Sequence, residues 1–120
     1  PKLLILDEPT GELDPQSSRQ IFEMLRQLNQ EQGVTIVVVE QKIALLAEFA
    51  HRLLVLQQGQ VMLDGSVAQI LSEPEKLNAC GVHCPRIATL ANRLTEMGYY
   101  QGTIPRNLDE AAAMVEEVLA

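Results

Sequence analysis

Apolar residues in the first part of the chain alternate between short continuous runs and a helical spacing. Residues 3–6 are Leu and Ile, and residues 34–39 are Val and Ile apart from Thr35; each segment has the length of a strand. Continuous runs of this kind predict strands buried on both faces, as in a parallel sheet. Between them, apolar residues recur at helical spacing over residues 16–32, with Asp14-Pro15 suited to the helix start and Gly33 to its end.

The pattern continues with a short helix predicted over residues 43–50. Two further strands, residues 53–56 and 61–63, are joined by a hairpin in which Gly59 suits a positive φ. Together these segments give the order strand, helix, strand, helix, strand, strand. That order predicts an α/β layered sheet with right-handed crossovers.

The remainder of the chain is helical in pattern. We predict helices over residues 66–71 and 85–97, the first ended by Pro74, and a last helix from Asn107 or Asp109 to residue 119. These segments would form a small helical extension of the sheet.

Composition narrows the class of protein. The 120 residues suit one compact unit, and 47% hydrophobic with only 3% aromatic residues suits aliphatic helices packed on a sheet. The net charge of -7 argues against a nucleic-acid partner.

No apolar run approaches the roughly 20 residues that cross a bilayer, so we expect any work at a membrane to be done from its side. Because the chain opens on Pro1, we do not expect this to be its native start.

Two cysteines lie close to a histidine, in the order Cys80, His83, Cys84. A structural zinc site needs four ligands, and no second cluster of Cys or His supplies the fourth. We therefore expect reduced thiols of a cytoplasmic protein rather than a metal site.

Two acids follow the first apolar run directly. Asp7 and Glu8 would lie where a buried parallel strand ends, the edge at which doubly wound sheets bind ligands. A magnesium-bound phosphate with an attacking water suits such a pair, although a solvated strand end would show the same two residues.

Several motifs in order resemble those of ATP-binding cassette (ABC) ATPases. Residues 3–10, Leu-Leu-Ile-Leu-Asp-Glu-Pro-Thr, resemble the Walker B strand, and Leu13-Asp14-Pro15 resembles the D-loop. After the second apolar run, Glu40-Gln41-Lys42 stands where the family has its switch loop. The resemblance continues to about Leu71. It implies a partial P-loop NTPase layered sheet, with residues 1–72 as the C-terminal half of an ABC ATPase core and residues 73–120 as a helical C-terminal extension.

The resemblance implies a role for each matching residue. Asp7 resembles the acid that holds Mg²⁺, commonly through water, and Glu8 the general base or water-orienting carboxylate. Asp14 resembles the D-loop acid that communicates with the opposite ATP site of a dimer. Gln41 stands where the family has a histidine that contacts the γ-phosphate of ATP. Thr10 is expected to shape the turn rather than to take part in chemistry.

Two positions depart from the family pattern. Gln41 can donate a hydrogen bond but cannot carry a positive charge, so we expect a slowed or specialised ATP site. Glu12 occupies a D-loop position that is often small or polar, and we expect a minor effect from it.

Two motifs of the family are absent from the 120 residues. There is no Gly-x-x-x-x-Gly-Lys-[Ser/Thr] loop to hold phosphates and no Leu-Ser-Gly-Gly-Gln signature. ATP and Mg²⁺ would therefore require an upstream half. We expect this chain alone to bind ATP poorly, to lack hydrolysis and to self-associate through an open sheet edge.

The extension resembles that of ATPases in energy-coupling factor transporters, which import vitamins or metal ions such as cobalt and nickel. The resembling positions are Cys80-Gly81-Val82, Pro85, Leu90-Ala91, Leu94, Gly98, Pro105 and Glu110-Ala111. This implies a second ABC ATPase subunit, identical or different, and an integral membrane transporter subunit as partners. It also implies a cytoplasmic protein on the inner face of the membrane.

Two other interpretations remain open. An ABC-type ATPase acting on nucleic acid or the ribosome shares these motifs, but the acidic balance and the lack of a Lys/Arg cluster speak against it. A non-catalytic dimerisation module would leave Glu8 idle. The presence of both Asp7 and Glu8 argues only weakly against that.

Overall fold

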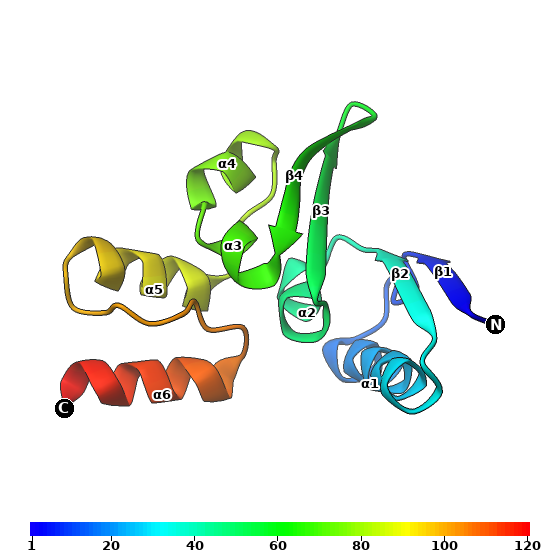
Figure 1. Ribbon diagram of the computed structural model, residues 1–120, viewed down its shortest axis with the longest axis horizontal. Helices are drawn as coiled ribbons and strands as arrows, with labels where there is room; N and C mark the ends of the chain where they lie inside the picture. The colour runs from blue at the N-terminus through cyan, green and yellow to red at the C-terminus, as the bar shows by residue number, and fades with distance from the viewer. The chain divides into compact units, whose positions relative to one another are not determined.

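The first two predicted strands pair in parallel, joined by a long helix. In the computed structural model, which describes residues 1–120, β1 (Leu3–Asp7) lies beside β2 (Thr35–Val39), and α1 (Pro15–Gln32) connects them (Figure 1). The register pairs Leu3 with Thr35 and Asp7 with Val39, so the two strands end together. This shared end will place the residues that follow each strand near one another.

The ends of α1 are set by the residues that the sequence indicates. The Asp14 carboxylate accepts a hydrogen bond from the Ser17 backbone N–H at 3.2 Å, and Pro15 is the first helical residue. Gly33 ends the helix in the left-handed conformation, with φ of 66°. On the buried side of the helix lie Ser18, Phe22 and Leu25.

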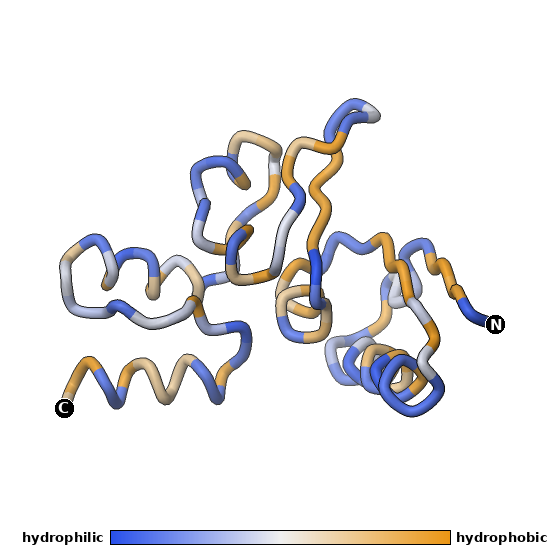
Figure 2. The backbone as a smooth tube through the Cα atoms, in the orientation of Figure 1, coloured by the Kyte–Doolittle hydropathy of each residue, from blue (hydrophilic) through white to orange (hydrophobic).

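The prediction that β1 and β2 are buried on both faces is wrong for this chain. Burial alternates along both strands, and every second residue is exposed. Helix α1 packs on β2, and within residues 1–45 no second complete helix is present to cover the other face of the sheet. The apolar side chains that remain exposed are Leu3, Ile5, Val37 and Val39. Along the backbone, both strands are coloured mostly as hydrophobic in Figure 2.

The predicted hairpin is confirmed, but it forms a second, separate sheet rather than part of one sheet. Strands β3 (Arg52–Gln57) and β4 (Gln60–Ser66) pair in an antiparallel manner. Their two-residue loop has positive φ at both Gln58 (51°) and Gly59 (75°), the geometry that matches the twist of a tight hairpin. The predicted α/β class is thus confirmed, with its four strands in two two-stranded sheets.

The remaining helices are short except at the C-terminus. They are α2 (Ile43–Phe49), α3 (Val67–Leu71), α4 (Pro74–Ala79), α5 (Arg86–Glu96) and α6 (Leu108–Leu119). Helix α4 was missed by the sequence analysis, which took Pro74 only as a stop. The residue instead begins a new helix, because proline is well tolerated in a first turn. Asn107, rather than Asp109, caps α6 through Glu110 N–H at 2.8 Å.

A single arginine closes the C-terminal end of α2. Arg106 lies in the segment before α6, and its Nε donates to the Ala47 carbonyl oxygen at 2.8 Å. Its Nη2 donates to the carbonyl oxygens of Glu48, at 3.3 Å, and Ala50. The last carbonyls of a helix have no partner within it, so a cation at this position satisfies both hydrogen bonding and the helix dipole.

The chain divides into two compact units, Pro1–Leu45 and Leu46–Ala120, so the expectation of one compact unit is wrong. The second contains the larger hydrophobic core, to which β3, α3, α4, α5 and α6 all contribute. The proposed division into an ATPase part, residues 1–72, and an extension, residues 73–120, stays a prediction, because compactness alone does not say where a functional domain ends. Among the helices, none combines the length and the apolar character needed to cross a membrane.

Candidate active site at the ends of β1 and β2

The site is built by two loops that leave the same edge of the parallel sheet. We call residues 8–14, after β1, the first loop, and residues 40–42, after β2, the second loop. Because Asp7 pairs with Val39, the loops start side by side, and the Glu8 backbone N–H donates to the Val39 carbonyl oxygen at 2.7 Å. The predicted site residues that follow β1 and those that follow β2 are therefore neighbours.

Glu8 is held in an unusual backbone conformation. Its φ of 48° lies in the left-handed region, which costs a non-glycine residue about 1–3 kcal/mol. Such conformations cluster at functional sites because the surrounding structure must enforce them. Here the enforced turn follows directly on the strand and leaves the Glu8 side chain exposed to solvent.

Glu8 and Gln41 contact each other. The Gln41 side-chain amide nitrogen Nε2 donates to Glu8 Oε1 at 3.1 Å, across 33 residues of sequence. Both side chains are exposed, so a substrate can reach them. The amide is a neutral donor that orients the carboxylate while leaving its charge intact. Two of the four residues predicted for the site are thus brought together.

Asp7 and Asp14 occupy other parts of the same unit. Asp7 is the last residue of β1 and is exposed. Asp14 is the N-cap of α1, where hydrogen bonds from the Ser17 hydroxyl and backbone N–H lower its pKa below the ordinary value. Its carboxylate is therefore engaged with its own helix rather than with Glu8 or Gln41.

The acids at the end of β1 suit a Mg²⁺ ion that keeps water and phosphate ligands, rather than a metal site whose ligands are all protein side chains. No cluster of three or more His, Cys, Asp or Glu side chains in the chain has the arrangement needed to hold a metal ion. Mg²⁺ usually takes only one or two carboxylates and completes its shell with water and substrate phosphates. Exposed Asp7, with Glu8 next to it, fits that pattern.

A buried threonine joins the two loops, which the sequence analysis did not foresee. Thr10 is 1% exposed, and its hydroxyl donates to Glu40 Oε2 at 2.6 Å. The other oxygen, Oε1, accepts the Gln41 backbone N–H at 3.0 Å. Partial burial opposes ionisation of Glu40, but these hydrogen bonds outweigh it and lower the pKa of the carboxyl. An acid directly after an apolar strand was the available signal.

A lysine makes a second connection between the loops. Lys42 Nζ donates to the Leu13 carbonyl oxygen at 3.3 Å and to Ser18 Oγ at 3.0 Å. Ser18 is fully buried, and its hydroxyl donates in turn to the Leu13 carbonyl at 3.4 Å. The second loop is thereby fixed to the start of α1, next to Asp14.

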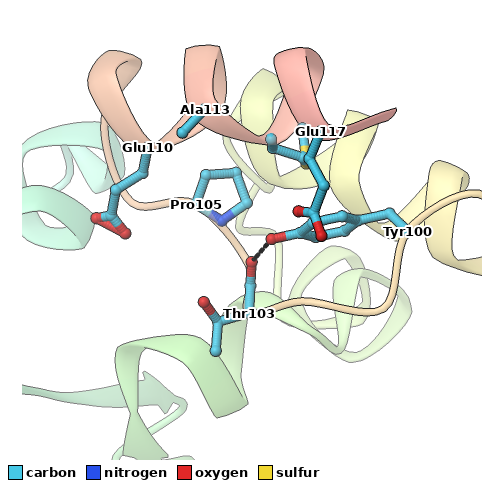
Figure 3. Close-up of a pocket in the computed structure, with 7 residues that line it drawn as sticks. Tyr100, Thr103, Pro105, Glu110, Ala113 and Glu117 are labelled. Carbon is cyan, nitrogen blue, oxygen red and sulfur yellow. Dashed lines mark hydrogen bonds between the residues drawn. The ribbon is translucent and has the colours of Figure 1, made fainter. Parts of the chain in front are cut away.

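A shallow pocket of about 220 Å³ lies elsewhere, in the second unit (Figure 3). The Tyr100 hydroxyl donates to the Thr103 carbonyl oxygen at 2.6 Å, so its hydrogen is used within the fold. Burial, and then the nearby charges of Glu117 and Glu110, raise the pKa of Tyr100. The pocket contains none of the residues predicted for the site.

Comparison with known sequences identifies relatives over most or all of the chain. The energy-coupling factor transporter ATP-binding protein EcfA2 of Clostridium perfringens is 37% identical over 82% of the chain, which covers 35% of that protein. EcfA2 of Symbiobacterium thermophilum is 36% identical over 100% of the chain and 41% of its own length. EcfA1 of Caldanaerobacter subterraneus is 32% identical over 97% of the chain and 40% of its own length.

Comparison with solved structures gives the same class of protein. The cbiO1 protein of Clostridium perfringens, part of the ABC transporter complex cbiONQ, matches with a TM-score of 0.57 and 33% identity. The match covers 75% of this chain and 36% of that one. A dimeric bacterial ABC transporter cassette matches with a TM-score of 0.52 and 36% identity, over 56% of this chain and 28% of that one.

The length of the match differs between this chain and its relatives. The chain spans between 35% and 41% of the length of the three curated relatives named above. No family model matches it. The likeness therefore concerns one part of each relative.

Proposed function

This chain is homologous to ABC transporter ATP-binding proteins, energy-coupling factor subunits among them, and from that premise we propose that it carries the hydrolytic edge of such an ATPase. The observation that supports this best is the hydrogen bond between Gln41 and Glu8 where β1 and β2 end. It brings together the two residues for which the motifs imply the γ-phosphate contact and the catalytic base. The activity belongs to the full-length protein that contains this part.

Each residue then has a definite task in hydrolysis. Asp7 would hold Mg²⁺, which offsets the negative charge of the phosphates beside the two acids. Glu8 would orient the attacking water and accept its proton. The Gln41 amide holds one Glu8 oxygen at 3.1 Å and leaves the other oxygen for the water. Asp14 would act across a dimer on the opposite ATP site, from its place at the N-cap of α1.

The partners follow from the relatives. EcfA2 and EcfA1 are named as energy-coupling factor transporter ATP-binding proteins, cbiO1 is part of an ABC transporter complex, and one matching cassette is dimeric. By analogy, the full-length protein would pair with a second ABC ATPase subunit, identical or different, and with an integral membrane subunit of an importer. It would work at the cytoplasmic face of the membrane.

The first prediction concerns nucleotide binding by the 120-residue chain. Because these residues hold no Gly-x-x-x-x-Gly-Lys-[Ser/Thr] loop, titration of the chain with Mg-ATP in a calorimeter is expected to give no detectable heat. The full-length protein, titrated in the same way, is expected to bind saturably. Saturable binding by the chain alone would mean that its own residues hold the phosphates, contrary to the proposal.

The second prediction concerns the neutral switch residue. Replacing Gln41 with histidine in the full-length protein is expected to raise ATP turnover about tenfold, because an imidazole can carry charge and exchange a proton where the amide cannot. The matched control is Gln27→His on the exposed side of α1, which should leave turnover unchanged. An unchanged or lower rate in Gln41→His would show that glutamine does not limit this site.

A further inference from the structure

We propose that Thr10 and Lys42 are positioning residues that fasten the first loop to the second, and so keep Gln41 in place against Glu8. The inference rests on the proposed function, because it assigns these residues an effect on ATP turnover. The hydrogen bonds of the two side chains go to Glu40, Leu13 and Ser18 rather than to Glu8 or Gln41. Their effect would be exerted through Glu40 and through the start of α1.

The first fastening closes a ring of hydrogen bonds. Thr10 donates to one oxygen of Glu40 at 2.6 Å, and the other oxygen accepts the Gln41 backbone N–H at 3.0 Å. The Gln41 side chain then returns to Glu8 at 3.1 Å, and Glu8 is two residues before Thr10 in the chain. Hydrogen bonds thus hold both the backbone and the side chain of Gln41 to the first loop: the backbone through Glu40 and Thr10, and the side chain through Glu8. A Gln41 side chain on an unfastened loop would sample other rotamers.

The second fastening lies at the opposite end of the first loop. Lys42 donates to the Leu13 carbonyl oxygen and to the buried Ser18 hydroxyl. Leu13 precedes Asp14, and Lys42 follows Gln41. A displacement of Asp14 or of Gln41 would therefore be passed to the other residue through the Lys42 side chain. The two loops are therefore expected to move together rather than independently.

These bonds are not needed to hold the strands or the helix together. The strands are paired along their length, and the Glu8 backbone N–H continues that pairing to Val39. Helix α1 has its own cap, from Asp14 to Ser17, and a backbone bond from Ser18 N–H to the Asp14 carbonyl at 2.9 Å. Loss of the loop fastenings should therefore show in turnover more than in folding.

The test uses ATP hydrolysis by the full-length protein. Thr10→Val removes the hydroxyl at nearly constant volume and is expected to lower kcat about tenfold, with KM for ATP changed less than about twofold, because misplaced catalytic groups act on the chemical step. Thr10→Ser restores the donor and should return kcat to near the wild-type value. Lys42→Met is expected to lower kcat in the same direction. The matched controls are the exposed Thr35→Val and Lys2→Met, which should leave kcat unchanged.

A double variant separates positioning from a folding defect. Thr10→Val combined with Glu40→Leu removes both members of the pair, so no buried polar group is left unsatisfied. The double variant should lose no more kcat than Glu40→Leu alone, because Thr10 acts only through Glu40 and has nothing left to position once that carboxylate is gone. Thr10→Val and Lys42→Met proteins with wild-type kcat would overturn the inference.

A separate variant, Glu8→Gln, tests the proposed function itself. If Glu8→Gln abolishes turnover while both loop variants keep it, only the positioning role fails. If Glu8→Gln leaves turnover unchanged, the proposed hydrolytic role itself fails, whatever the loop variants do.

Discussion

Replacing Glu8 with glutamine in the full-length protein is expected to lower kcat for ATP hydrolysis at least about a hundredfold. The amide keeps the size of the side chain but cannot accept a proton from water. Mg-ATP binding should persist, because the change leaves Asp7 in place. Turnover is measured as phosphate release at saturating Mg-ATP, and binding by calorimetry on the same preparation.

The matched control lies on the same loop. Glu12→Gln makes the same chemical change at an exposed position and is expected to keep turnover within about twofold of wild type, because Glu12 is assigned no part in the chemistry. Equal losses in both variants would point to the charge of the loop rather than to a base at Glu8. Full activity in Glu8→Gln would support the interpretation of the chain as a dimerisation module.

Replacing Arg106 with methionine is expected to lower the free energy of unfolding of the second unit by about 2–4 kcal/mol. The change keeps much of the apolar stem but removes the donors to two carbonyls in the last turn of α2 and to the carbonyl of Ala50 just after it. Those carbonyls include that of Ala47, a residue only 2% exposed. Intrinsic fluorescence suits the measurement, because the chain has no Trp and its two Tyr residues, Tyr99 and Tyr100, both lie in this unit.

The measurement is urea unfolding of the 120-residue chain, followed by tyrosine fluorescence. Arg86→Met, at an exposed position at the start of α5, is the matched control and should shift the free energy of unfolding by no more than about 0.5 kcal/mol. Arg106→Lys should fall between the two, because an ammonium cannot reproduce the planar arrangement of guanidinium donors. Equal midpoints for Arg106→Met and Arg86→Met would show that the three hydrogen bonds contribute little.

The sequence predicted the ends of helices and the hairpin turn correctly wherever a few neighbouring residues determine them. Asp14, Pro15 and Gly33 set the ends of α1, and Gln58-Gly59 formed the expected hairpin turn. The order of motifs also predicted the family that the relatives confirm. These features depend on backbone geometry within a few residues, which a sequence displays directly.

Features that depend on contacts between distant segments were harder to predict. The apolar runs indicated strands buried on both faces, but burial depends on which other elements cover them. Within residues 1–45, α1 is the one complete helix that packs on this sheet. The pairing of Thr10 with Glu40 spans 30 residues and needs the parallel register of β1 and β2 before it can be seen. For the same reason Thr10 was read only as a turn residue.

The exposed apolar face of β1 and β2 has a consequence for any cell in which residues 1–120 are produced without the rest of the full-length protein. Leu3, Ile5, Val37 and Val39 present a continuous apolar surface on paired strands, with exposed fractions between 44% and 65%. Molecular chaperones and proteases act on such surfaces, because these are the surfaces that incompletely folded chains display. Quality control would therefore set the abundance of the isolated polypeptide, and its half-life should lengthen when a complementary apolar partner is produced beside it.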